Sequence, residues 1–246
     1  MTQIDNLKHK LKELRLNAMS GQLEEVLQVV KQNNLDFLGA LERLMDIELE
    51  YRHQAAVKRK FQQSKLREKI TIDGFDFNHH KSREDQKARI LDLLNLEFIG
   101  GKMDVIIIGN PGTGKTFLAK AIAFAACQAN IKVLFTTAID MINQLIAAQA
   151  DYSLLKKLQY YQSPDLLCLD ELGYLALGEQ GSDLFFQVIS HRHQQKSTLL
   201  TTNLRFADWG KVFNSTTAAT AIADRLVYHS EVLIMEGGSY RRRPNT

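Results

Sequence analysis

Residues 109–116, with the sequence GNPGTGKT, have the residue types and spacing of a phosphate-binding loop. They fit the pattern G-x-x-x-x-G-K-[ST], in which glycines let successive backbone N–H groups turn toward phosphate oxygens. Lys115 would reach the β- and γ-phosphates of ATP, and the Thr116 hydroxyl would ligate Mg²⁺. An apolar run precedes the loop and a helix-like run follows it, which is the context this motif needs. We expect nucleotide contacts from Gly109, Asn110, Pro111, Gly112, Thr113, Gly114, Lys115, Thr116 and Phe117.

A second run, residues 166–171, consists of four apolar residues followed by the carboxylates Asp170 and Glu171. A buried strand that ends in acid delivers charge to the metal position, so Asp170 is the expected Mg²⁺ ligand. Glu171 would polarise the attacking water as a general base. In isolation the run could also be a strand that ends at an acidic turn. Together with the phosphate loop, the doublet predicts hydrolysis of the γ-phosphate.

Three further polar residues later in the chain are candidates for the nucleotide site. Asn203 ends the run at 198–202 and could orient the water or contact the γ-phosphate. Arg225, on an apolar helical stretch, and Arg241, near the end, could neutralise charge on the transferring phosphoryl group. On chemistry alone each arginine could equally be a solubilising or salt-bridging surface residue.

The composition limits the class of protein. The chain has 246 residues, of which 45% are hydrophobic and 24% charged, enough for one sizeable α/β domain and a small accessory domain. No signal-like start or membrane-length apolar stretch is present, so we expect a cytoplasmic bacterial protein without a membrane partner. Cys127 and Cys168 lie in apolar runs and are expected to be buried.

The positive charge is concentrated before the phosphate loop. Residues 1–69 hold thirteen Lys/Arg and ten Asp/Glu, whereas the remaining residues hold eighteen of each. Within 51–69 there are seven basic side chains against Glu68 alone, which indicates a surface for an anionic polymer or, alternatively, a solvated helix face. The expected DNA contacts are Arg52, Lys58, Arg59, Lys60, Lys65 and Arg67.

Apolar periodicity predicts three N-terminal helices, with breaks at Ser20-Gly21 and Asn33-Asn34, the third running on through Phe61. An aperiodic linker at 72–77 and a helix at 83–98 follow. Strands are predicted near 104–108, 132–136, 166–170, 197–202 and 231–235. Helices are predicted near 115–129, 138–149, 153–162, 182–195, 206–213 and 217–228. Short apolar strands between helices indicate a parallel five-stranded sheet covered on both faces, with the phosphate loop at its carboxyl edge.

The order of these motifs resembles the AAA+ ATPases, and in particular the clade of bacterial helicase loaders and IstB-type transposition helper proteins. The resemblance rests on GNPGTGKT, LCLDELGYL, STLLTTN, ADWGKVF, AIADRL and GGSYRRR, and it covers nearly the whole chain. It implies a P-loop AAA+ domain at 71–246, preceded by a helical DNA-binding and oligomerisation domain at 1–70. About ten residues follow the last predicted strand, so we expect no C-terminal helical lid, a form that IstB-like proteins share.

The resemblance also implies roles. Asn203 would be the first sensor, Arg225 the arginine finger given to a neighbouring subunit, and Arg241 the second sensor, acting in its own subunit or in another. Homo-oligomers dependent on ATP and DNA would bind and remodel double-stranded DNA and recruit and stimulate the cognate transposase of an insertion sequence. The alternatives are a replicative-helicase loader and, in another class, a small-molecule phosphotransferase. Glu171 and Arg225 argue against the phosphotransferase, and the basic segment favours DNA over a protein partner.

Overall fold

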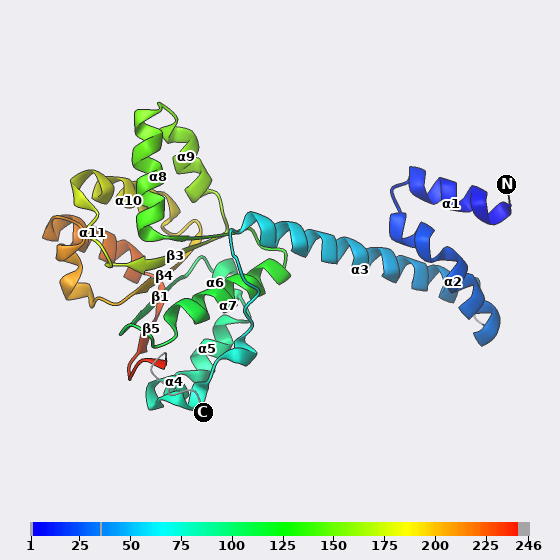
Figure 1. Ribbon diagram of the computed structural model, residues 1–246, viewed down its shortest axis with the longest axis horizontal. Coiled ribbons are helices and arrows are strands. Elements are labelled where there is room, and N and C mark those ends of the chain that lie inside the picture. The colour runs from blue at the N-terminus through cyan, green and yellow to red at the C-terminus, as the bar shows by residue number, and fades with distance from the viewer. Residues whose placement is uncertain (1, 35, 241–246) are drawn as a thin grey trace. The chain divides into compact units, whose positions relative to one another are not determined.

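The computed structural model, which describes residues 2–34 and 36–240, begins with three helices (Figure 1). They are α1 (Gln3–Glu13), α2 (Asn17–Asn33) and α3 (Phe37–Gln63). The first helix starts at a capping box in which the Thr2 and Asp5 side chains bond each other's backbone N–H groups. Asn34 takes a left-handed conformation with φ of 53°, so the predicted break at Asn33-Asn34 is confirmed. The third helix runs past Phe61, also as predicted.

The predicted break at Ser20-Gly21 is wrong, because α2 passes through both residues. The chain turns instead at Arg15, whose φ is 57°. The first turn of α2 has no side-chain cap of its own, and the Glu48 carboxylate on α3 accepts the Ala18 and Met19 N–H groups at 2.9 and 3.2 Å. A carboxylate from thirty residues away therefore caps this helix, which local sequence patterns cannot reveal.

The chain divides into two compact units, Met1–Arg59 and Lys60–Thr246. The division falls before residue 70 because the segment after α3 packs on the second unit. The Phe135 N–H donates to the Ser64 carbonyl at 2.7 Å, and Leu66 is buried in the core beside the sheet. Residues 60–70 therefore belong structurally with the phosphate loop.

The second unit contains a five-stranded parallel sheet, as predicted. Its strands are β1 (Asp104–Gly109), β2 (Val133–Thr137), β3 (Leu166–Leu172), β4 (Ser197–Thr202) and β5 (Ser230–Met235), in the order β2-β3-β4-β1-β5. Because all strands run the same way, β1 and β3 deliver the phosphate loop and the acidic doublet to one edge of the sheet.

The predicted helices between the strands are present with small shifts at their ends. They are α7 (Lys115–Gln128), α8 (Ala138–Ala150), α9 (Leu154–Gln162), α10 (Gly178–Arg192), a 3-10 helix (Phe206–Lys211) and α11 (Thr216–Val227). The single helix predicted at 83–98 is wrong. It is divided into α4 (Lys81–Asp85), α5 (Lys87–Leu93) and α6 (Glu97–Gly100). The break between α4 and α5 is at Gln86, and α6 is separated from α5 by Leu96, which turns left-handed with φ of 62°. The linker at 72–77 forms 3-10 turns at Ile72–Gly74 and Phe77–His79.

Helices cover both faces of the sheet (Figure 1). Val105 and Ile107 of β1 face the layer that contains α5, α6 and α7, whereas Ile106 and Ile108 face the layer of α8 to α11. Cys127 and Cys168 are free thiols within the first of these layers, and both are fully buried, as predicted. Across residues 2–34 and 36–240, none of the helices is both long and apolar enough to cross a lipid bilayer.

Candidate nucleotide site

The phosphate loop lies between the end of β1 and the start of α7, where its glycines are sterically required. Gly112 and Gly114 have φ of 81° and 98°, a region that favours residues without a Cβ. A Cβ on Gly112 would overlap Ser239, and one on Gly114 would meet Phe75 and Arg83. The loop is therefore enclosed on two sides by segments distant in sequence, with Lys115 as the first residue of α7.

Lys115 and Thr116, at the start of α7, contact the phosphate loop and the acidic doublet. The Lys115 ammonium group donates to the carbonyls of Gly109 and Asn110 at 2.7 and 2.9 Å, so it lies across the mouth of the loop. The Thr116 hydroxyl donates to Oδ1 of Asp170 at 3.0 Å. The structure thus joins the phosphate loop to the acidic doublet, which lies 54 residues further along the chain.

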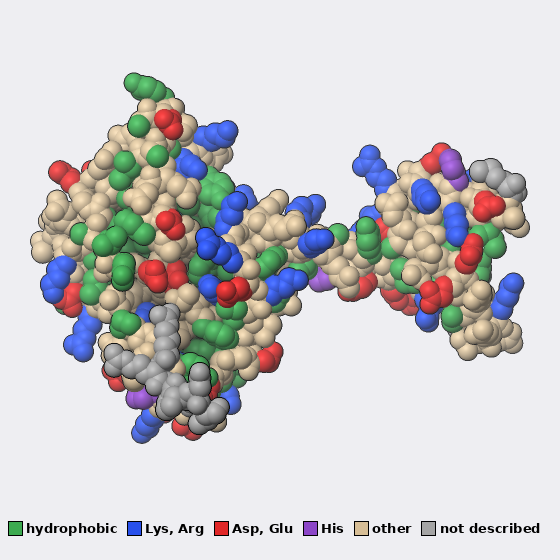
Figure 2. Space-filling model, viewed as in Figure 1, with side chains coloured by type: hydrophobic (Ala, Val, Ile, Leu, Met, Phe, Trp, Pro, Cys, Tyr) green, Lys and Arg blue, Asp and Glu red, His purple; other side chains and the backbone are tan. Residues whose placement is uncertain are grey.

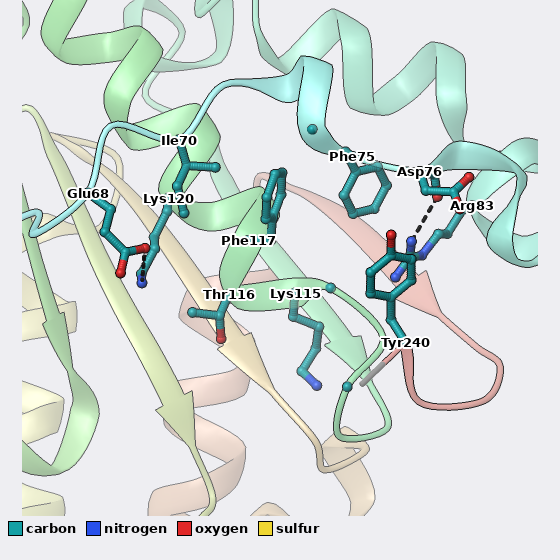
Figure 3. Close-up of a pocket in the computed structure, with 13 residues that line it drawn as sticks. Glu68, Ile70, Phe75, Asp76, Arg83, Lys115, Thr116, Phe117, Lys120 and Tyr240 are labelled. Atoms are coloured by element: carbon teal, nitrogen blue, oxygen red, sulfur yellow. Dashed lines mark hydrogen bonds and ion pairs between the residues drawn. The ribbon is translucent and has the colours of Figure 1, made fainter. Parts of the chain in front are cut away.

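A cavity of about 340 Å³ opens beside the phosphate loop (Figure 3). We call it the loop cavity. Phe75 and Phe117 line one side, and Lys115 and Thr116 line the other. The two rings lie 5.8 Å apart between centroids. An apolar wall beside phosphate-binding N–H groups is suited to a nucleotide, because the base and the phosphates have opposite polarity. The predicted contact from Phe117 lies at this cavity.

A second cavity, of about 690 Å³, lies beside the ends of β2 and β3, and we call it the carboxylate cavity. Thr116, Asp170 and Glu171 line it together, so both predicted carboxylates reach the same space. Asp170 is 4% exposed, whereas Glu171 is exposed. Thr116 lines both cavities, so the predicted metal ligands lie between the loop and the doublet.

The oxygens of Thr116 and Asp170 form a donor set that suits Mg²⁺. They are hard ligands, and Mg²⁺ is bound in proteins by a few oxygens together with nucleotide phosphates and water. The 3.0 Å hydrogen bond between them shows that the two side chains already converge on one point. These residues therefore fit the metal that ATP carries.

Arg83 on α4 is a residue of this site that sequence reasoning missed. It is 3% exposed, and its Nε and Nη2 donate to the Thr113 carbonyl of the phosphate loop at 3.2 and 2.7 Å. Its guanidinium group lies 4.5 Å from the centre of the Phe75 ring and 5.4 Å from that of Tyr240. Arg83 therefore ties the linker, the loop and the segment after β5 together. No local motif marks it, since its partner in the loop comes from 30 residues away.

The remaining predicted site residues lie outside the two cavities or outside the described residues. Asn203 is exposed just after β4. Arg225 lies on α11, where it donates to the Ala221 carbonyl at 2.9 Å and its guanidinium group lies 4.5 Å from the centre of the Phe186 ring. It lines neither cavity of its own chain. Arg241 falls beyond residue 240.

The predicted DNA-binding residues fall into three environments. Arg52 forms an ion pair with Glu48 at 2.9 Å and also donates to the Arg15 carbonyl, so it is engaged within the N-terminal unit. Lys58 and Arg59 are exposed on α3, and Lys60 is half-buried. Figure 2 shows Lys and Arg side chains gathered around the C-terminal end of α3. The other two, Lys65 and Arg67, are exposed and line the carboxylate cavity.

Comparison with known proteins identifies sequence relatives over almost the whole chain. Residues 9–246 match the family described as IstB-like ATP binding protein. An insertion sequence IS5376 putative ATP-binding protein from Geobacillus stearothermophilus is 35% identical over 230 residues, covering 94% of this chain and 91% of the relative. An IS232 putative ATP-binding protein from Bacillus thuringiensis subsp. berliner is 33% identical and covers 94% and 92%.

Solved structures share the fold of the second unit at low sequence identity. A DnaC helicase loader matches with a TM-score of 0.59 and 22% identity, covering 72% of this chain and 99% of that structure. AMPPCP-bound DnaA from Aquifex aeolicus matches with a TM-score of 0.59 and 21% identity, covering 72% and 53%. These likenesses establish a P-loop AAA+ fold.

Proposed function

The chain belongs to the family of IstB-like ATP-binding proteins, and we propose that it hydrolyses ATP to drive transposition of an insertion sequence. The observation that carries this proposal is the 3.0 Å contact between Thr116 and Asp170, with Glu171 lining the same cavity. A site that only bound nucleotide would not need a second carboxylate at that position. Glu171 is the feature that favours turnover.

The residues divide the reaction between them. Backbone N–H groups of the loop and Lys115 hold the phosphates of ATP, and Phe75 and Phe117 offer the base an apolar wall. Thr116 and Asp170 are the proposed Mg²⁺ ligands, and Mg²⁺ when bound would neutralise charge on the phosphate oxygens. Glu171 accepts a proton from the water that attacks the γ-phosphorus atom. ADP and phosphate are the products.

We place the arginine finger in trans. Arg225 lines neither cavity of its own chain, which supports delivery to the nucleotide of a neighbouring subunit. A guanidinium group there would stabilise charge on the transferring phosphoryl group. The active form would then be a homo-oligomer whose sites are complete only at subunit interfaces. Asn203 and Arg241 keep their proposed sensor roles.

We propose double-stranded DNA as the polymer that this protein binds, through the basic segment 51–69. Lys58 and Arg59 are exposed on one helix, and Lys65 and Arg67 are exposed on the segment that follows it. Contacts of Lys and Arg with phosphates give binding that depends little on sequence and strongly on salt. Because Arg52 is paired with Glu48, we expect its contribution to be smaller than theirs.

The cognate transposase is the proposed protein partner, because the sequence relatives are named for insertion sequences. Helicase loading remains the competing role, since a DnaC helicase loader shares the fold. The test is to measure phosphate release from ATP and the mass of the protein with ATP, each with and without duplex DNA. We expect ATP hydrolysis and a larger assembly with both ligands present. A monomer that releases no phosphate under any condition would contradict the proposal, and binding to a replicative helicase instead of DNA would favour the loader.

A further inference from the structure

The acidic doublet lies at an irregularity in the pairing of β3 with β4. Leu169 pairs with Leu200 and Leu172 pairs with Thr202, so Asp170 and Glu171 together oppose one residue, Thr201. Two residues opposite one is the pattern of a β-bulge, which re-aims side chains at the end of a strand. The bulge therefore lies at the two carboxylates of the proposed catalytic site.

The bulge explains how two consecutive carboxylates reach one cavity. Successive side chains of a regular strand point to opposite faces of the sheet, yet Asp170 and Glu171 both line the carboxylate cavity. Glu171 has φ of 60°, a left-handed conformation that is strained for a residue with a Cβ. Such strain persists only where neighbouring groups hold it in place.

The Thr201 hydroxyl contacts both residues of the bulge. It accepts a hydrogen bond from the Glu171 N–H at 3.0 Å and donates its proton to Oδ1 of Asp170. A threonine hydroxyl has one proton and two lone pairs, so it can serve both partners at once. Thr201 is 1% exposed, and water cannot readily take its place.

We propose that Thr201 is a positioning residue for the two catalytic carboxylates, an inference that rests on the proposed ATPase function. Its donated bond fixes the Asp170 carboxylate for metal binding, and its accepted bond holds the backbone turn that directs Glu171 into the cavity. The Thr116 hydroxyl donates to the same oxygen of Asp170 but is itself a proposed metal ligand. Once Thr116 serves the metal, Thr201 is the remaining side-chain donor to Asp170 among the described residues.

The neighbouring Thr202 provides a matched control. It is equally buried on the same strand, and its hydroxyl also makes two hydrogen bonds, to the Leu172 carbonyl at 2.8 Å and from the Leu204 N–H at 3.1 Å. It contacts neither carboxylate. Both Thr201→Val and Thr202→Val remove a buried hydroxyl from β4. Only Thr201→Val removes hydrogen bonds to Asp170 and Glu171.

The experiment compares Thr201→Val, Thr201→Ser and Thr202→Val in the full chain. Two quantities are measured: kcat for ATP hydrolysis, and binding of a fluorescent ATP analogue as Mg²⁺ is titrated. Thr201→Val should lower kcat and weaken the Mg²⁺-dependent part of binding by about 10- to 100-fold, as substitution of residues that support metal ligands does. Binding without Mg²⁺ should remain. Thr201→Ser should recover most of both quantities, because it keeps the hydroxyl.

Wild-type kcat and Mg²⁺ dependence in Thr201→Val would overturn the inference, as would equal decreases in Thr202→Val. If Thr201→Val does not fold, Thr201→Cys replaces it, since a thiol is close in shape but a weak donor. That variant should fall between wild type and complete inactivity, and full activity would overturn the inference. If the wild type releases no phosphate, the ATPase proposal fails, while the Mg²⁺ titration still tests Thr201.

Discussion

The two units of this chain bury their apolar side chains to very different degrees. In the second unit, β1, β3 and β4 are almost entirely buried between two layers of helices. In the described part of the N-terminal unit, only Met19, Leu23 and Val26 are buried apolar residues. Large apolar side chains remain exposed there, including Leu14, Phe37, Leu38, Met45 and Leu49, each at least half exposed. Hydrophobic side chains are visible on the surface of this unit in Figure 2.

The difference shows where each unit can carry its function. Proximity of reacting groups needs a rigid support, and the second unit provides one by placing the nucleotide site at the edge of a closed core. The N-terminal unit buries few apolar side chains, so a partner of this unit would be contacted by side chains on its surface. Substitutions at the nucleotide site should therefore affect chemistry, and substitutions in the basic segment 51–69 should affect DNA binding. Each prediction below tests that separation.

The largest expected effect tests whether one chain supplies all the residues that ATP hydrolysis needs. Arg225→Ala should lower kcat by roughly 10³-fold, as removal of arginine fingers does, while ATP binding persists. Mixing it with Lys115→Ala should restore part of the activity, because some interfaces would pair an intact loop with an intact finger. Arg205→Ala, at another exposed arginine, is the control and should keep wild-type turnover. Mixed oligomers without recovered activity would mean that Arg225 acts in its own subunit.

The next largest effect is expected from Lys115→Ala, which should weaken ATP binding and leave DNA binding unchanged. Lys115→Ala eliminates charge-assisted hydrogen bonds worth about 1.5–3 kcal/mol each, so ATP affinity should fall roughly 100-fold or more. Calorimetric titration with ATP measures this decrease. Duplex DNA measured without nucleotide should bind as it does to the wild type. A parallel decrease in nucleotide-free DNA binding would break the proposed separation.

Substitutions in the basic segment should weaken DNA binding and leave ATP binding unchanged, with a smaller change in affinity. Changing Lys58, Arg59 and Lys60 together to Ala should lower DNA affinity and reduce the salt slope by about 0.9 for each phosphate that is no longer neutralised. Three exposed cations on α1 and α3, Lys10, Lys12 and Arg43, provide a control of equal charge. Fluorescence anisotropy with duplex DNA at several salt concentrations measures both slopes. Equal slopes for the two triple variants would mean that the segment is a solvated face or a protein-docking surface.

The two units should also differ in how their stability depends on pH. Burial raises the pKa of Asp104 in the second unit to about 7, although the Thr198 N–H and Arg192 oppose that shift. Burial would also raise the pKa of Glu48, but hydrogen bonds from Arg52, Met19 and Ala18 outweigh it and hold the pKa below its ordinary value. The second unit should therefore lose stability as pH rises from about 4 to 7, by at most about 4 kcal/mol, because unfolding releases a proton. The N-terminal unit should lose stability as pH falls below the ordinary pKa of Glu48.

Hydrogen–deuterium exchange can follow each unit separately as pH changes. Asp104→Asn should weaken the loss of stability of the second unit as pH rises, and Glu48→Gln should weaken the loss of stability of the N-terminal unit as pH falls. Protection that changes in the same direction in both units of the wild type would contradict this assignment.

The sequence was most informative where neighbouring residues carry the signal. The loop GNPGTGKT and the run that ends in Asp170 and Glu171 were sufficient to predict the strands that carry them and the convergence of both motifs on one edge of a parallel sheet. Those patterns work because strand burial and loop geometry are local properties of the chain. The predicted strand positions agree closely with the structure for the same reason.

The features that were missed or wrong depend on contacts across the fold. Arg83 contacts Thr113, Thr201 contacts Glu171, and Glu48 caps α2, each across about thirty residues of sequence. Glu48 holds the first turn of α2, just before Ser20-Gly21. The β-bulge at Asp170 and Glu171 arises from pairing with β4, and the left-handed turn at Leu96 has no glycine to mark it. Each of these features depends on residues that are distant in sequence, and the periodicity of apolar residues does not report such contacts.

Glu171→Gln gives the most direct test of the proposed catalytic site, because it changes one carboxylate oxygen to an amide nitrogen and leaves the shape of the side chain. The variant should bind ATP with wild-type affinity and lower the single-turnover rate of phosphate release by about 10²- to 10⁴-fold, the usual contribution of a general base. The same protein should keep its duplex DNA affinity, since the basic segment is unchanged. Phosphate release at the wild-type rate by Glu171→Gln would contradict the assignment of Glu171 and, with it, the catalytic site described for this chain.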